Sequence, residues 1–323
     1  MDTRKLISFG TSSYVVSVPK QWVQDNKLKK GDLLHVEKRN EELVLSRNEV
    51  PQHEPLRISI GTDGKTIERL RIEIISAYLN NYEIIEIYGK QLEQEATQVK
   101  EIIRTLSGLE VVQQTATRII ARDLINLREI SITTLIRRVD NIIRSMLQDM
   151  VESFHQNHYE SIYERDMEVN RLVFLAFRVI RVAMQNTKLA RTLALSPLEL
   201  LYSKEIISKL ENIGDQAKRI ARHIKATSTL TAQEREDLRN LAVRLNADYF
   251  LVMKAYYKRD LALAFQTEAA HKEVLSQCSA YQQRNNILHT AGIITNYKNL
   301  RGAIRDISRA IIGMGENPFL RSE

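Results

Sequence analysis

The sequence predicts a multidomain, mainly α-helical protein: a small β-rich segment, a small central α/β segment and a C-terminal pair of three-helix bundles. Its 323 residues exceed the usual size of a single hydrophobic core. Short strand-like runs and turn signals alternate over the first 126 residues. From residue 128 onward, Gly and Pro are scarce and apolar residues recur with helical spacing.

The composition is that of a soluble globular protein, with 43% hydrophobic and 27% charged residues. The best candidate for a membrane span, residues 172–184, is interrupted by Arg178 and Arg181, so we expect no span. The N-terminus lacks the apolar core of a signal peptide. The single cysteine, Cys278, excludes an internal disulfide and fits a reducing compartment. We therefore expect a cytoplasmic protein.

Residues 1–48 contain short strands that are too small to form their own core. A strand-like run at 14–18 stops at Pro19, and a turn at 30–32 precedes short strands at 33–36 and 43–45. A unit of this size buries too little apolar surface to be stable alone. Dimerisation through residues 1–48 is therefore expected.

This segment resembles the AbrB/SpoVT swapped-hairpin domain in the run Val15-Val16-Ser17-Val18-Pro19, in Leu28 with Gly31-Asp32, and in the hairpin ending Leu43-Val44-Leu45. The resemblance implies a dimeric β-barrel that binds DNA through a basic face. At the positions of the family's arginines, this chain has Val15, Val23 and Gln24. The remaining cations that could contact DNA phosphates are Arg4, Lys5, Lys20, Lys27, Lys29 and Lys30. Alternatively, these are solvated charges on a module that only dimerises. Net charge does not decide, because residues 1–50 hold nine Lys and Arg against seven Asp and Glu.

Residues 56–126 predict a small α/β domain, separated from the N-terminal segment by a proline-containing linker at 49–55. The pattern gives strands at 56–60, 83–88, 109–114 and 118–124, and helices at 65–80 and 92–107. The two glycines of Gly61-Thr62-Asp63-Gly64 lack the remainder of a nucleotide-binding loop and indicate a plain turn. No active-site constellation is evident, so we interpret this domain as a spacer.

The helical half divides into two bundles of three helices, residues 128–226 and 230–316. The predicted boundaries lie near 155–158, 196–197, 227–231, 258–260 and 284–286. The Ser196-Pro197 pair fits a helix N-cap followed by proline at the first helical position.

An acidic motif lies in the third of these helices. Glu211 and Asp215 are four residues apart, so both carboxylates leave one face of the helix. Asp166 and Asn170 repeat that spacing on the preceding helix. Oxygen ligands of this kind suit a hard cation. The alternative is a solvated face, on which Asp215 forms ordinary helix-surface pairs with Lys218 and Arg219.

Two phrases resemble PhoU, the phosphate-signalling regulator: residues 162–170 (Ile-Tyr-Glu-Arg-Asp-Met-Glu-Val-Asn) and 207–221 (Ile-Ser-Lys-Leu-Glu-Asn-Ile-Gly-Asp-Gln-Ala-Lys-Arg-Ile-Ala). The resemblance covers about residues 128–316. It implies two three-helix bundles whose acidic motifs bind metal, commonly iron, with zinc or other divalent ions also reported. It therefore predicts a divalent or iron cation at Asp166, Asn170, Glu211 and Asp215.

The two bundles repeat one another weakly. Residues 154–166 align without gaps on 256–268, which places Glu268 opposite Asp166. With a shorter offset, Asp306 lies opposite Asp215, whereas Gly302 stands where Glu211 stood. Lys272 similarly replaces Asn170. Glu268 and Asp306 therefore predict only a weaker second metal site.

A basic stripe runs along the second helix of the first bundle, formed by Arg171, Arg178, Arg181 and Lys188. It is either the solvated side of a helix or a surface for phosphate, a nucleotide, DNA or an acidic partner. Two Glu-x-x-His pairs, Glu152 with His155 and Glu268 with His271, are attributed to chance. No Ser-His-Asp or Cys-His arrangement is evident, so the chain is not expected to be an enzyme.

These features predict a phosphate-responsive transcriptional regulator. In this interpretation a homodimer binds DNA through its N-terminal domains, and the PhoU-like bundles sense metal, phosphate or a partner protein. The alternative is a signalling adaptor that binds no DNA and docks on a phosphate transporter or another regulator.

Overall fold

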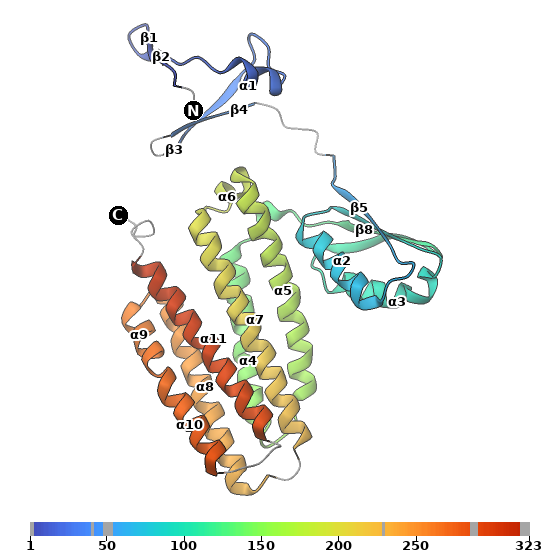
Figure 1. Cartoon of the computed structure of the whole chain (residues 1–323), viewed down its shortest axis with the longest axis vertical. Coiled ribbons are helices and arrows are strands. Elements are labelled where there is room, and N and C mark those ends of the chain that lie inside the picture. Colours follow the sequence, from blue (N-terminus) through green and yellow to red (C-terminus); the bar gives the residue numbers. More distant parts are fainter. Residues whose placement is uncertain (1–2, 40–41, 48–53, 228–229, 285–289, 317–323) are drawn as a thin grey trace. The chain divides into compact units, whose positions relative to one another are not determined.

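The computed structural model describes residues 3–39, 42–47, 54–227, 230–284 and 290–316, and shows a mainly helical chain (Figure 1). It divides into two compact units, Met1–Glu54 (unit 1) and Pro55–Glu323 (unit 2). Three sequence expectations fall wholly or partly outside the described residues: the linker at 49–55 and the helix boundaries at 227–231 and 284–286.

Unit 1 contains two separate antiparallel hairpins and one short helix. Strand β1 (Ile7–Phe9) pairs with β2 (Ser13–Val15), and β3 (Leu34–Arg39) pairs with β4 (Glu42–Arg47). Helix α1 (Lys20–Asp25) lies between the hairpins in sequence and begins after Pro19. The predicted run at 14–18 is shorter in the structure, since β2 ends at Val15, and β1 was not foreseen.

No described residue of unit 1 is buried. Its exposed large apolar side chains are Leu6, Ile7, Phe9, Tyr14, Val15, Val16, Leu33, Val36 and Leu43. Exposed apolar surface of this extent is costly in water. The described residues of one copy of unit 1 therefore form no hydrophobic core, and the swapped-hairpin barrel stays a prediction.

The α/β domain at the start of unit 2 has the predicted order of six elements. These are β5 (Arg57–Gly61), α2 (Ile67–Leu79), β6 (Ile84–Tyr88), α3 (Leu92–Arg104), β7 (Leu109–Thr115) and β8 (Arg118–Asp123). The sheet order is β5-β6-β8-β7, in which only β5 and β6 run parallel. Apolar residues of α2 and α3, such as Leu70, Ile74 and Val99, pack against sheet residues such as Ile85 and Ile87.

The helical region follows a short 3-10 turn, Leu127–Glu129. Its helices are α4 (Ile132–Glu152), α5 (Tyr159–Gln185), α6 (Thr187–Thr192), α7 (Pro197–Ala226), α8 (Ala232–Lys258), α9 (Leu261–Ala269), α10 (His271–Arg284) and α11 (Ala291–Glu316). Two details differ from the expected six helices. The short α6 precedes α7, and one long helix is divided at Ala270 into α9 and α10. As expected, Ser196 caps α7 in a capping box with Glu199, and Pro197 follows at the first helical position.

The helices of the two predicted bundles, α4 to α7 and α8 to α11, share one hydrophobic core. Helices α7 and α11 run side by side (Figure 1), and the Lys209 ammonium lies 2.8 Å from the Asp306 carboxylate across them. The Tyr249 and Tyr257 hydroxyls of α8 donate hydrogen bonds of 2.7 and 3.0 Å to the buried Asp140 carboxylate of α4. Among the described residues, no helix has both the length and the apolar character that crossing a membrane requires.

Candidate functional site

The acidic motif surrounds one lysine. The Lys218 Nζ atom on α7 lies 2.7 Å from Asp166 Oδ2 on α5 and 3.0 Å from Asp215 Oδ1. Arg219 Nη2 lies 2.6 Å from the second oxygen of Asp215. Asn170 Nδ2 donates a 3.2 Å hydrogen bond to Asp166 Oδ2. The ion pair between Lys218 and Asp166 thus joins α7 to α5.

Lys218 neutralises a carboxylate that has little access to water. The Asp166 side chain is 6% exposed, and a buried carboxylate is stable only when it is paired or hydrogen-bonded. Burial alone would lower the pKa of Lys218, but its hydrogen bonds to Asp166 and Asp215 outweigh burial and raise that pKa. The ammonium group therefore stays charged between the two carboxylates.

Glu211 is the unpaired member of this cluster. Burial raises the pKa of its carboxyl group, and repulsion from Asp215 and then Asp166 raises it further. Among the described residues, no hydrogen bond or ion pair is formed by its side chain. The cluster of Asp166, Glu211, Asp215, Lys218 and Arg219 therefore contains more carboxylates than cations.

The geometry allows a test of the predicted metal site at Asp166, Asn170, Glu211 and Asp215. The structure brings these residues to one place, but the Lys218 ammonium lies between two of the carboxylates. In the part of the chain that is described, no three His, Cys, Asp or Glu residues are grouped so as to hold a metal ion. This arrangement does not fit a metal while Lys218 keeps both ion pairs, and the metal site stays a prediction.

The weaker second site has a different arrangement. Glu268 pairs with Arg309 of α11 at 3.1 Å. Asp306 pairs with Lys209 at 2.8 Å and with Arg305 at 3.6 Å. Each of the two acids thus has cationic partners of its own, and the second metal site also stays a prediction.

The basic stripe contains a residue that neither interpretation of the sequence anticipated. Arg178 is fully buried, and its Nε and Nη2 atoms donate to Asn81 Oδ1 at 3.1 and 2.8 Å. Its guanidinium group also forms an ion pair with Asp123 and lies 4.7 Å from the ring centroid of Tyr78. Since Asn81, Asp123 and Tyr78 belong to the α/β domain, Arg178 fastens that domain to α5.

Arg181 has the same role one turn later, where its Nη1 donates a 2.8 Å hydrogen bond to Asn80 Oδ1. Arg171 and Lys188 of the stripe are exposed, although the Arg171 carbonyl oxygen accepts a 3.5 Å hydrogen bond from Ser107 Oγ of the α/β domain. The sequence did not reveal this docking role, because periodicity along one helix does not show which domain packs on it. The stripe is therefore largely a domain interface.

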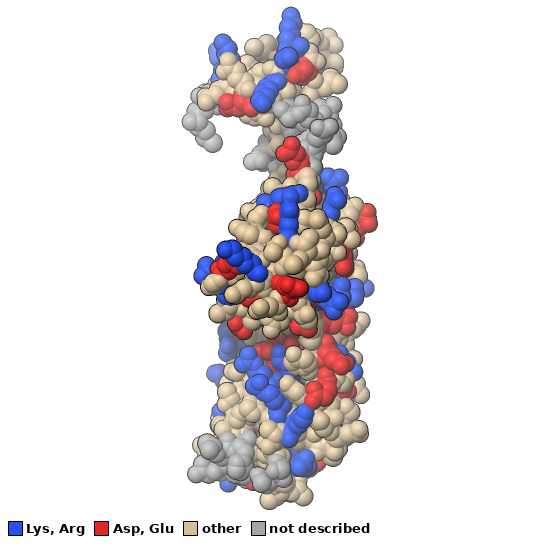
Figure 2. Space-filling view, turned by 90° about the vertical axis from the view of Figure 1, so that its right-hand side faces the viewer, with Lys and Arg blue, Asp and Glu red and all other residues tan. Residues whose placement is uncertain are grey.

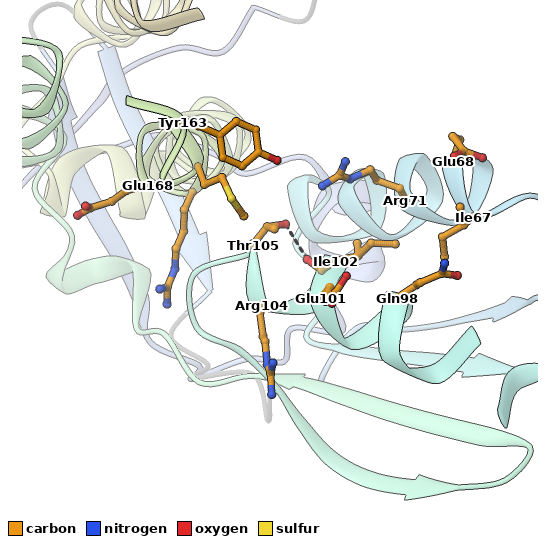
Figure 3. Close-up of a pocket in the computed structure, with 12 residues that line it drawn as sticks. Ile67, Glu68, Arg71, Gln98, Glu101, Ile102, Arg104, Thr105, Tyr163 and Glu168 are labelled. Carbon is orange, nitrogen blue, oxygen red and sulfur yellow. Dashed lines mark hydrogen bonds between the residues drawn. The ribbon is translucent and has the colours of Figure 1, made fainter. Parts of the chain in front are cut away.

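A cavity of about 830 Å³ lies where α2 and α3 approach α5 (Figure 3). Tyr163 of α5 and Arg71 of α2 point toward one another across it, whereas Arg104 points away. The Tyr163 side chain is 45% exposed. The lining residues are Ile67, Glu68, Arg71, Gln98, Glu101, Ile102, Arg104, Thr105, Tyr163, Met167, Glu168 and Arg171. No single motif predicted this groove, since its lining comes from three helices.

The six cations predicted to contact DNA are all exposed on unit 1 (Arg4, Lys5, Lys20, Lys27, Lys29 and Lys30). Lys27 adopts a left-handed backbone conformation, with φ of 53°, just after α1. The backbone N–H of Lys29 donates a 2.7 Å hydrogen bond to Asp32 and closes the following turn. On the visible face of this unit, at the top of Figure 2, basic side chains are spread among acidic ones.

Residues 136–224 match the PhoU domain. The PhoU match begins within α4 and ends near the end of α7, so it contains Asp166, Glu211, Asp215 and Lys218. It covers less than half of the chain, and unit 1, the α/β domain and α8 to α11 lie outside it. No curated protein and no solved structure matches the chain.

A PhoU domain suggests signalling in phosphate homeostasis. The match supports the resemblance that was drawn from residues 162–170 and 207–221. The AbrB/SpoVT resemblance of unit 1 has no such support and stays a prediction. Lys218 was expected only as a surface partner of Asp215, because its contact with Asp166 depends on how α5 and α7 are aligned.

Proposed function

We propose that this chain is a phosphate-responsive regulator that dimerises and binds DNA through unit 1, while its helical region receives the signal. The PhoU match at residues 136–224 carries the link to phosphate homeostasis. A ligand that favours one arrangement of the helices would change the affinity of the dimer for DNA by its differential binding free energy. No step of this proposal requires catalysis, and it places the protein in the cytoplasm.

Dimerisation rests on the exposed apolar side chains of unit 1. Leu6, Ile7 and Phe9 are exposed in one chain, as are Tyr14 and Val15 of the paired strand. A second copy would remove this surface from water. Light scattering at micromolar concentration should give at least twice the 37.3 kDa chain mass. The double variant Ile7→Glu with Phe9→Glu should lower that mass, and a monomeric wild type would contradict the proposal.

DNA binding rests on the exposed lysines of unit 1. If about six cations per dimer contact phosphates, log K should fall with log salt with a slope of roughly −5. The triple variant Lys20→Ala, Lys27→Ala and Lys29→Ala should weaken binding and flatten this slope. A matched control removes three exposed lysines of unit 2 that lie outside the basic stripe (Lys254→Ala, Lys258→Ala and Lys272→Ala). Equal losses in both triple variants would show that DNA is bound through general charge rather than through unit 1.

A second candidate is an adaptor that regulates a phosphate transporter or another regulator by protein contact. The groove between α2, α3 and α5 favours it, because Tyr163 and Met167 leave partly exposed apolar surface beside charges of both signs. Val15, Val23 and Gln24 at the positions of the AbrB/SpoVT arginines also favour it.

One cellular experiment separates the two candidates. In a strain that lacks the gene, phosphate uptake should no longer fall when external phosphate is plentiful, and the full chain should restore the response. The lysine triple variant of unit 1 should fail to restore it if DNA binding transmits the signal. Full restoration by that variant would identify the adaptor.

A further inference from the structure

The helical region has two halves, α4 to α7 and α8 to α11, whose buried residues repeat the same pattern. With Glu268 opposite Asp166, the buried Ala264 and Val274 lie opposite the buried Ile162 and Leu172. The same ion pair also recurs between helices. With Asp306 opposite Asp215, Arg309 lies opposite Lys218, and Arg309 pairs with Glu268 just as Lys218 pairs with Asp166. The weak sequence repeat is thus accompanied by a repeated pattern of contacts.

In this alignment of the two halves, one set of buried positions is apolar in the first half and ionisable in the second. In the first half, a layer of the core is formed by four buried residues: Met146, Val169, Leu210 and Gly214. The opposite positions of the second half are ionisable: Asp248, His271, Arg301 and Arg305. Placing an arginine at a core position costs free energy unless the guanidinium group finds partners. We call Asp248, His271, Arg301 and Arg305 the polar layer. These ionisable side chains must find polar partners at positions that are apolar in the first half.

Arg301 is 0% exposed and only partly satisfied. Its Nη2 atom donates to the Thr267 carbonyl oxygen, and its Nε atom lies 3.4 Å from Asp248 Oδ2. Its Nη1 atom has no hydrogen-bond acceptor among the described residues. Neighbouring Arg305 also has partners for only some of its guanidinium nitrogens. Its Nη1 atom lies 3.1 Å from His271 Nε2, but its buried Nε atom has no acceptor.

His271 contributes a further donor. Because an arginine always carries its protons, the 3.1 Å contact makes His271 Nε2 the acceptor. Burial lowers the pKa of His271, and the charges of Arg305 and Arg301 lower it further, so the neutral ring carries its proton on Nδ1. That atom is buried and has no acceptor among the described residues. Four buried donors of this layer therefore have no hydrogen-bond acceptor among the described residues: Arg301 Nε and Nη1, Arg305 Nε and His271 Nδ1.

We propose that the polar layer binds a small oxyanion of the size of phosphate, held by Arg301, Arg305 and His271. Several acceptor oxygens on one anion satisfy such donors better than a single water molecule does, and guanidinium groups bind oxyanions with charge-assisted hydrogen bonds. The proposal deepens the proposed function, since a phosphate ligand would be a direct input, and it is tested by binding in solution rather than by cellular regulation.

The acids around the polar layer are already paired, which limits the repulsion that an anion meets. The Arg305 side chain is 30% exposed, so this residue of the layer is open to solvent. Glu268 is already paired with Arg309, at 3.1 Å. Asp248 is already paired with Arg301 and Arg244, at 3.4 and 3.5 Å.

Calorimetry on the full chain tests this site, with inorganic phosphate titrated at constant ionic strength in chloride. We expect saturable binding of one phosphate per chain. His271→Gln and Arg305→Gln should each weaken it roughly tenfold or more, since each removes a hydrogen bond to a charged ligand. Arg305→Lys keeps the charge but loses the guanidinium fork, so it should also weaken binding. The matched control is Lys272→Gln, an exposed neighbour of His271 with the same charge change, and it should leave the affinity unchanged.

Competition by sulfate at similar affinity would support an oxyanion site without selectivity for phosphate. The proposal is overturned if the wild type binds no phosphate at a phosphate concentration on the order of 10 mM. It is also overturned if all variants bind phosphate with equal affinity. The layer would then hold water molecules. Such a failure would leave the cellular test of phosphate regulation untouched, so the two proposals can fail separately.

Discussion

The first and second halves of the helical region place their charges differently on the same framework. The first half gathers carboxylates around Lys218 at the edge of α5 and α7, and keeps Met146, Val169 and Leu210 apolar inside. The second half keeps the corresponding edge pair, Arg309 with Glu268, but takes Arg301 into its core. Because a buried charge costs free energy unless it is fully paired, the charged core of the second half is the more costly arrangement.

The largest expected effect comes from breaking the buried charges of the second half. Arg301→Ala would leave the Asp248 carboxylate buried beside only the partly exposed Arg244. We expect the free energy of unfolding to fall by about 3–5 kcal/mol, as when one partner of a buried ion pair is removed. Urea unfolding followed by circular dichroism measures this loss.

The control for this prediction transplants the apolar layer of the first half, with Asp248→Met, His271→Val, Arg301→Leu and Arg305→Ala together. Replacing a whole buried charge cluster by apolar residues is often neutral or stabilising. The free energy of unfolding of this variant should therefore lie within about 2 kcal/mol of the wild-type value. It should also lose phosphate binding. A transplant that is as unstable as Arg301→Ala would show that the two halves do not share one packing framework.

The edge pairs provide the second comparison. The Asp166 side chain is 6% exposed, whereas that of Glu268 is 34% exposed. Lys218→Met leaves a buried carboxylate with only the Asn170 amide and should cost about 2–3 kcal/mol. Arg309→Met breaks a solvated pair and should cost less than about 1 kcal/mol. Equal losses in urea unfolding would mean that the two pairs are screened alike.

Much of the fold could be predicted from the sequence, because it depends on local patterns. The alternation of strands and helices in residues 56–126, and the capping pair Ser196-Pro197, are written in consecutive residues. The break at Ala270 was missed, since the Ala269-Ala270 pair is a good helix former and contains no breaker. There the tertiary structure overrides propensity.

The candidate sites were less predictable, because their chemistry depends on the alignment of helices. The sequence grouped Asp166 with Glu211 and Asp215 but did not show that Lys218 reaches across to Asp166. It treated Arg178 as surface, although Asn81 and Asp123 of another domain enclose it. His271 was attributed to chance, since its arginine neighbours lie some 30 positions away in the chain, at 301 and 305.

The metal hypothesis yields the third comparison. If Lys218 takes the place of a cation, Lys218→Ala should expose Asp166, Glu211 and Asp215 as oxygen ligands. Manganese or iron(II) at about ten times its dissociation constant should then raise the melting temperature of that variant by roughly 2–4 °C. Adding Glu211→Gln and Asp215→Asn should abolish the rise. An equal rise in wild type would instead show that metal displaces Lys218, as the family resemblance implies.

The smallest expected effect concerns pH and distinguishes His271 from its apolar counterpart, Val169. The groups that face His271 are Arg301, Arg305 and Arg309 of α11 and Glu268 of α9. Burial, followed by the arginine charges, lowers its pKa below the ordinary value of 6.5. As the pH falls below that value, the unfolded chain takes up a proton before the folded chain does, so stability is lost on the acid side.

His271→Val should therefore reduce the loss of unfolding free energy between about pH 7.5 and pH 5 by on the order of 1 kcal/mol. The remaining loss includes His223, whose pKa burial also lowers and which is unchanged in the variant. Phosphate should act in the same direction in wild type. An oxyanion beside His271 favours the charged ring, raises its folded-state pKa and so flattens the acid-side loss. If phosphate binds by calorimetry but leaves this pH dependence as steep as before, the anion lies elsewhere than in the polar layer.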